Sequence, residues 1–183
     1  MTTDELGQLF LIIITDYNPD WPRLAIIESN KIVDIVGQEF ISRIEHIGST
    51  AVPGLCAKPT IDFLLEILEI INCDLLIKQL EEIDYHFIPK LENPAPHMMF
   101  AKGYSESGIT GQTFHIHVRY PGDWDEIIFR DYLIKNQLVK ADYAKLKRKL
   151  ANEYKNDREK YTDRKTTFIK NATLTARKNK NKI

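Results

Sequence analysis

Several features that would assign this chain to a specialised class of protein are scarce in its sequence. Its 183 residues include two cysteines, Cys56 and Cys73, too few for a disulfide framework or a structural zinc site. We interpret both as reduced thiols of a cytoplasmic protein. The apolar run Leu9–Ile14 has only six residues and follows acidic ones, so we expect neither a signal peptide nor a membrane span.

Acidic residues are also scarce toward the C-terminus, where none follows Asp163. Residues 140–183 carry 15 basic and 5 acidic side chains, against 10 and 21 in residues 1–139. Such a positive region can attract phosphates, or bind nucleic acid in a salt-dependent way. The alternative is a solvated helix face followed by a flexible basic tail at 177–183. No recognition motif accompanies the charge, so nucleic acid is the weaker partner hypothesis.

Composition and apolar periodicity predict one mixed α/β domain over residues 1–176. With 43% hydrophobic and 28% charged residues, the chain can bury one substantial core. The stretch Gly103–Gly111 is rich in turn residues. Periodicity predicts strands at Leu9–Thr15, Arg43–Ile47, Thr60–Leu68, Tyr85–Pro89, His97–Lys102 and Thr113–Tyr120. Helices are predicted at 22–40, Asp74–Ile83, Asp123–Asn136, Leu138–Tyr154 and Asp157–Ala176.

The segment between the second and third predicted strands has the character of a phosphate and metal site. Gly48, Ser49 and Thr50 end one strand, and small residues at such a turn let backbone N–H groups and hydroxyls approach a phosphate. Asp62, early in the next strand, is a candidate Mg²⁺ ligand, and Lys58 can neutralise phosphate charge. The alternative is an ordinary turn with Asp62 bonded to a backbone amide. The glycine spacing of a P-loop is absent.

A second cluster alternates along Thr113–Tyr120, where His115 and His117 fall on one face of a strand. Both imidazoles can therefore reach one metal ion or phosphate. Arg119 continues this face and adds a guanidinium that can bind phosphate. Histidines on one face of an amphipathic strand also occur as ordinary edge residues, and that alternative stays open.

The predicted C-terminal helices contribute two further candidates for ligand binding. Arg130, beside Asp131, can orient a ligand or pair locally with its neighbour. Lys165 lies four residues after Tyr161, so the two side chains share a helix face and can point into a cleft or into solvent.

Three stretches resemble one known family: EHIGSTAVPGLCAKPTIDFLL at 45–65, FHIHVRYPGDWDEIIFRDYL at 114–133, and the pairs Tyr143/Lys147 and Tyr161/Lys165. The chain is similar to the GrpB family, largely of unknown function, within the nucleotidyltransferase (polymerase-β-like) superfamily. The resemblance implies a nucleotidyltransferase-like mixed β-sheet flanked by helices, with further helices C-terminal. It also implies that Ser49 binds nucleotide phosphate and that Asp62 is the first metal acid.

The same resemblance exposes one departure from the superfamily pattern. A second acid is expected two residues after Asp62, where this chain has Leu64, and His115 or His117 occupies the expected place of the third acid. Glu66 lies about 13 Å along the strand from Asp62, so Glu45 and His46 are nearer substitutes. A two-metal site of three carboxylates is therefore not expected.

Three functions remain compatible with these residues. The first is nucleotidyl transfer, with Asp62 and His117 as catalytic groups and one Mg²⁺ or Mn²⁺ held by Asp62, His115 and His117. Its phosphate-binding residues are Gly48, Ser49, Thr50, Lys58, Arg119, Arg130 and Lys165. The second is a non-catalytic module that binds a nucleotide or phosphorylated small molecule. The third is a metal-dependent phosphohydrolase. The sequence predicts no membrane partner and indicates no oligomeric state.

Overall fold

The computed structural model describes residues 11–180. Five α-helices, two short 3₁₀ helices and five strands alternate within this range. In chain order they are α2 (Trp21–Val36), η1 (Gln38–Phe40), β1 (Ile41–Ile47), η2 (Ser49–Ala51), β2 (Thr60–Ile67), α3 (Cys73–Glu81), β3 (His86–Pro89), β4 (Met98–Ser105), β5 (Gly108–Arg119), α4 (Asp125–Lys135), α5 (Gln137–Glu153) and α6 (Arg158–Lys180).

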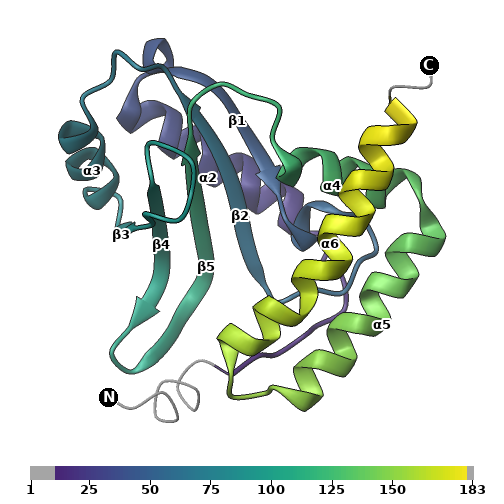
Figure 1. The fold of residues 1–183 in the computed structure, drawn as a ribbon. Helices are drawn as coiled ribbons and strands as arrows, with labels where there is room; N and C mark the ends of the chain where they lie inside the picture. The colour runs from purple at the N-terminus through teal and green to yellow at the C-terminus, as the bar shows by residue number, and fades with distance from the viewer. Residues whose placement is uncertain (1–10, 181–183) are drawn as a thin grey trace.

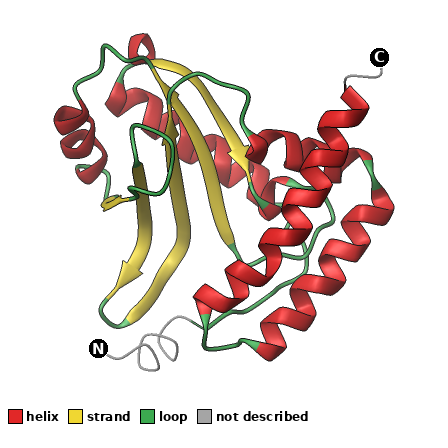
Figure 2. Cartoon of the chain, in the orientation of Figure 1, coloured by secondary structure: helices red, strands yellow, loops and turns green. Residues whose placement is uncertain are grey.

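The strands form one mixed sheet in the order β1-β2-β5-β4-β3 (Figure 2). Only the β2–β5 pair is parallel, and it joins strands separated by α3, β3 and β4. The other three pairs are antiparallel. The predicted mixed α/β class is confirmed, and β2 is an inner strand, as its apolar character predicts.

The main core lies between one face of the sheet and the helices α2 and α3, and α2 runs behind the sheet in Figure 1. Alternate residues of β2 and β5 point into this core because successive side chains of a strand face opposite sides. Pro22 in the first turn of α2 needs no N–H donor, and Gly37, at φ 93°, ends the helix at Val36, four residues before the predicted limit. The core members in these elements are Trp21, Ala25, Ile32, Val36, Ile61, Phe63, Leu65, Ile67, Leu76, Leu80, Phe114, Ile116 and Val118.

A second apolar cluster joins the loop after β1 to the C-terminal helices. Val52 and Leu55 of the loop pack with Leu133 of α4 and Tyr143 of α5, and Phe168 of α6 packs against them. Figure 1 shows α5 and α6 lying side by side, outside the main core. The helices therefore hold the loop that precedes β2 beside the uncovered face of the sheet.

Three parts of the chain differ from the sequence predictions. Residues 11–14 of the predicted strand Leu9–Thr15 form no strand, and Thr15 makes only an isolated bridge to Ala57; residues 9 and 10 lie outside the described range. Ile12 packs instead against α5 and α6. The turn-rich stretch 103–111 is mostly strand, because β4 and β5 continue to a tight turn between Ser105 and Gly108. Helix α6 extends to Lys180, four residues past the predicted limit.

The structure also bears on the expectations about cysteines and membrane-spanning helices. Cys56 and Cys73 are both free thiols. Among residues 11–180, no helix combines the length and the apolar character needed to cross a membrane.

Candidate functional site

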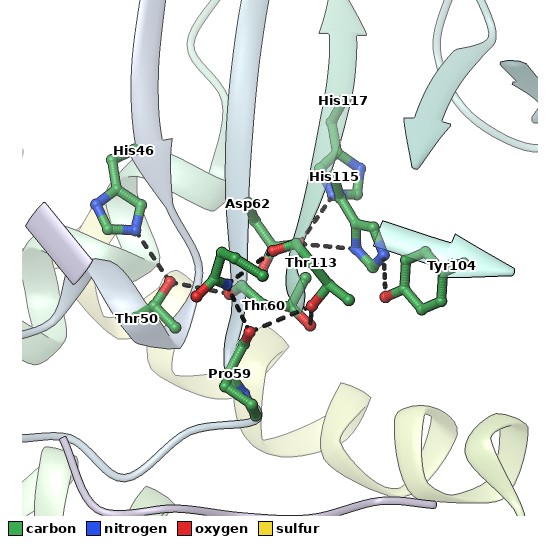
Figure 3. A network of polar contacts seen from close by, with 10 residues as sticks. His46, Thr50, Pro59, Thr60, Asp62, Tyr104, Thr113, His115 and His117 are labelled. Carbon is green, nitrogen blue, oxygen red and sulfur yellow. Dashed lines mark hydrogen bonds and ion pairs between the residues drawn. The ribbon is translucent and has the colours of Figure 1, made fainter. Parts of the chain in front are cut away.

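Asp62, His115 and His117 lie together on the sheet face opposite the main core, as Figure 3 shows. The parallel register aligns Asp62 with His115, and Leu64 with His117. His115 Nδ1 is 3.0 Å from Asp62 Oδ1, and His117 Nε2 is 3.7 Å from the same oxygen. One ligand atom from each residue lies within 4.8 Å of the others. The structure thus brings together the three residues predicted as metal ligands.

The orientation of His115 is fixed from both sides of its ring. Its Nε2 is 2.8 Å from the Tyr104 hydroxyl, which lies on β4, while Nδ1 faces Asp62. The two rings are stacked, with centroids 5.7 Å apart. A metal-binding imidazole commonly uses its second nitrogen in this way, which fixes the tautomer and the ring plane. Tyr104 is a supporting residue that the sequence did not reveal.

Gly48 lies directly beside the Asp62 carboxylate. A Cβ atom on Gly48 would fall 2.6 Å from Asp62 Oδ2, and the residue has φ 72° and ψ −168°, which an L side chain rarely adopts. The glycine therefore allows the turn after β1 to close over the acid. Its role is close approach to Asp62.

Ser49 and Thr50, the next two residues of the turn, have different surroundings. Ser49 lines the cavity above the sheet and shares a hydrogen bond with Tyr143 of α5. Thr50 is fully buried, where its hydroxyl donates to the Thr60 carbonyl and meets His46 Nε2 at 2.9 Å. Thr50 thus braces the turn against β2, whereas Ser49 is placed to meet a ligand.

The cavity in front of the triad has a volume of about 710 Å³. Its cations come from four different parts of the chain: Lys58 from the loop before β2, Lys90 from the loop after β3, Lys147 from α5, and Arg158 and Lys165 from α6. Carboxylates at its mouth come from Glu92, Glu159 and Asp163, all exposed. Asp62 also lines the cavity and is its only carboxylate that is not exposed, so the partly buried lysines share the cavity with one acid of the triad.

Three of these lysines lie in surroundings that disfavour their charge. Burial and, to a smaller extent, Arg158 lower the pKa of Lys58 to about 8, although Asp62 opposes them. Burial likewise lowers the pKa of Lys165 to about 8. It lowers that of Lys147, only 2% exposed, to about 7. Among residues 11–180, no ion pair joins any of the three to a carboxylate.

Burial acts in opposite directions on the pKa of Asp62 and on that of His46, which lies on β1. Burial would raise the pKa of Asp62, but hydrogen bonds with His115 and His117 outweigh it and hold the carboxyl well below its usual range. Burial lowers the pKa of His46 to about 4. Asp62 is therefore ionised at neutral pH, and His46 is a neutral partner of Thr50.

Both arginines predicted as phosphate ligands lie outside this cavity, as do Gly48 and the buried Thr50. Arg119 is 4% exposed, and α4 covers its end of β5, where its guanidinium donates to Glu126 and stacks near Trp124. Arg130 of α4 donates to Glu45 and to the His46 carbonyl of β1. Neither guanidinium lines the cavity.

No second carboxylate joins Asp62 from its own strand or from β1. Leu64 faces the same side as Asp62 but is fully buried. Glu66 accepts from Arg43 at the far end of the strand, and Glu45 pairs with Arg130. Both glutamates are thus held by arginines away from the triad. Among the described residues, Asp62 is the only carboxylate grouped with His115 and His117.

Lys147 and Arg158 are the main cavity residues that sequence reasoning did not assign. A usable signal was present, because Tyr143 and Lys147 repeat on α5 the four-residue spacing of Tyr161 and Lys165 on α6. In both pairs the ammonium lies over the phenol ring, 4.9 Å from the centroid in the first and 4.1 Å in the second. The repeated spacing indicates two helices facing one cavity.

The comparisons with known proteins agree with this architecture. The family model described as GrpB protein matches residues 11–174. Glutamate-rich protein GrpB of Alkalihalophilus pseudofirmus is 33% identical over 162 residues, 86% of this chain and 91% of that protein. UPF0157 protein BH1888 of Halalkalibacterium halodurans is 32% identical over 159 residues, 86% and 78% of the two chains.

A solved structure extends the similarity to three dimensions. The crystal structure of conserved protein GrpB from Enterococcus faecalis superimposes with a TM-score of 0.78 at 32% identity, covering 91% of this chain and 98% of that chain. The shared mixed sheet is consistent with the nucleotidyltransferase-like fold that the sequence motifs imply. With the family model matching nearly the whole described range, the chain belongs to the GrpB family.

Proposed function

We propose that this protein binds one divalent transition-metal ion through Asp62, His115 and His117, and a phosphorylated small molecule or nucleotide in the adjoining cavity. The observation that carries the proposal is the convergence of Lys58, Lys147 and Lys165 on this cavity, where none of them forms a salt bridge among the described residues and only Asp62 partly offsets the charge of Lys58 and Lys165. Holding unpaired cations away from water costs free energy, which an anionic ligand would offset. Phosphate groups have the required charge and acceptor oxygens.

The donor set favours particular metals. Two imidazole nitrogens and one carboxylate suit Zn²⁺, Mn²⁺ or Fe²⁺ better than Mg²⁺, which prefers oxygen ligands in octahedral geometry. Of the two metals expected from the sequence, Mn²⁺ therefore fits better than Mg²⁺. The triad faces a cavity, so coordination positions stay open toward a ligand. A bound metal would supply Lewis-acid polarisation of a phosphoryl oxygen.

Metal binding should raise the melting temperature of the protein, because the ion binds only the folded triad. At a hundredfold excess over Kd, a ligand stabilises by about 2.7 kcal/mol, or roughly 5–10 °C for a chain of this size. We expect this shift with Zn²⁺ or Mn²⁺, and its loss in Asp62→Asn and His117→Ala. His86→Asn, which alters an exposed histidine of β3, should keep it. A full shift in both triad variants would refute the metal site.

Anion binding is tested separately by titrating pyrophosphate calorimetrically in the presence of EDTA. We expect Lys58→Gln and Lys165→Gln each to weaken binding about tenfold, the worth of one charge-assisted contact. The exposed Lys170→Gln of α6 is the matched control. Affinity should also fall between pH 7 and 9.5, because the lysines whose pKa lies near 8 lose their charge there. Equal affinity in all variants would argue against the cavity as the anion site.

Nucleotidyl transfer is the second candidate, supported by the contact between the Gly48–Ser49 turn and Asp62. Positioning and electrostatic stabilisation of the phosphoryl group would supply its rate. Incubation with a nucleoside triphosphate and Mn²⁺ separates the candidates: transfer releases pyrophosphate, hydrolysis releases orthophosphate, and a binding module releases neither. Either product should disappear in Asp62→Asn.

A further inference from the structure

Lys147 is the most enclosed cation of the cavity, and its ammonium nitrogen has an unusual set of neighbours. It is 2% exposed yet borders the cavity. Its Nζ donates to the Cys56 carbonyl and lies over the ring of Tyr143. Two nearby cations, Lys165 and Arg148, disfavour its charge, and the Cys56 thiol is the one titratable group that opposes burial. No described carboxylate compensates its charge.

These surroundings activate an amine for nucleophilic attack. A lysine reacts only as the neutral amine, and enclosure among apolar groups or beside another cation is how proteins keep it neutral. Its pKa of about 7 agrees with this geometry, since the amine is then about half neutral at neutral pH. Lys58 and Lys165 are more exposed and keep more of their charge. The cavity thus pairs one reactive amine with two anion-binding ones.

We propose that Lys147 forms a reversible imine with phosphorylated aldehydes or ketones, whose phosphate is held by Lys58 and Lys165. This inference rests on the proposed anion site and names a substrate class for it. The Nζ lone pair adds to the carbonyl carbon, and the oxygen leaves as water with the two amine protons while the C=N bond forms. The step needs no oxidant or reductant. Ser49, which borders the same cavity and is held by Tyr143, can donate a hydrogen bond to the carbonyl oxygen.

The test uses two aldehydes of the same ring system, pyridoxal 5′-phosphate and 5′-deoxypyridoxal, which lacks the phosphate ester, followed by borohydride reduction and peptide mass mapping of the full chain. Neither has the free hydroxyl through which pyridoxal closes to a hemiacetal. We expect one reduced adduct, on Lys147, formed at least tenfold faster with the phosphorylated aldehyde and suppressed by excess inorganic phosphate. Lys147→Met should abolish the adduct, and the exposed Lys145→Met of the same helix should keep it. The melting temperature of each variant establishes that it is folded.

The outcomes distinguish this inference from the function on which it rests. If inorganic phosphate binds but the adduct forms on Lys58, Lys165 or surface lysines, the imine role of Lys147 is refuted and the anion site stands. Equal labelling of Lys147 by both aldehydes would refute phosphorylated carbonyl compounds as the substrate class. Absence of phosphate binding together with absence of the adduct would refute both proposals.

Discussion

Replacing Gly48 with alanine should destabilise the protein by roughly 3 kcal/mol and weaken metal binding about a hundredfold. The backbone at φ 72° and ψ −168° is almost restricted to glycine and costs of order 1–3 kcal/mol for another residue. The added Cβ would also meet Asp62 Oδ2 at 2.6 Å, so the carboxylate must move. Displacing a ligand or its support typically costs 10–100-fold in metal affinity. Urea unfolding and metal titration measure the two effects.

Gly111→Ala is the matched control for Gly48→Ala. Gly111 also has a positive φ, 78°, but a Cβ atom added to it would have no heavy atom within 4 Å. It shares the backbone strain and lacks the contact with Asp62. We therefore expect a loss of about 1–2 kcal/mol in stability with unchanged metal affinity. Wild-type metal affinity in Gly48→Ala would mean that the turn does not position Asp62.

Replacing Lys147 with methionine should stabilise the protein at neutral pH, by roughly 2 kcal/mol. Burial holds the pKa of Lys147 at about 7, against 10.5 for an exposed lysine, and each unit corresponds to about 1.4 kcal/mol. Methionine removes this penalty but leaves the Cys56 carbonyl without its donor, which costs about 1–3 kcal/mol. The first effect is the larger. Chemical denaturation at pH 7 measures the difference.

The pH dependence of stability gives a sharper test of the same residue. Between about pH 7 and 10.5 the unfolded chain keeps a proton that folded Lys147 has lost, so stability rises with pH in this window. From pH 7 to 9 Lys147 alone should contribute about 2 kcal/mol, and Lys147→Met should lack this increment. Lys145→Met, with a side chain 82% exposed, should keep it. If the stability of Lys147→Met rises with pH as steeply as that of the wild-type protein, Lys147 remains charged in the folded protein.

The triad was predictable because strand alternation is local. His115 and His117 fall on one face of their strand by spacing alone, and Asp62 begins an apolar run typical of an inner strand. That the two strands pair in parallel depends on β5 inserting between β2 and β4. No local pattern contains that information, and the family resemblance predicted only that His115 or His117 takes the place of a metal acid.

The cavity was less predictable because its cations depend on how helices pack. Arg119 continues the histidine face by spacing, yet α4 covers that end of β5 and Glu126 binds its guanidinium. The spacing of Lys147 from Tyr143 was its only signal, since nothing in α5 alone indicates that the loop after β1 lies against it. Helix-to-loop packing thus decides which of the predicted cations meet a ligand.

The parallel register between β2 and β5 restricts which changes in length the chain can accept. The hydroxyl oxygens of Thr60 and Thr113 are 2.9 Å apart and form a hydrogen bond. These residues lie two positions before Asp62 and His115 in the two strands. A one-residue insertion in either strand would exchange its two faces, sending the metal-site residues toward α2 and core residues such as Phe63 or Ile116 into the cavity. Catalogues of natural or engineered variants should therefore show substitutions within these strands, and insertions or deletions only in the loops that join them.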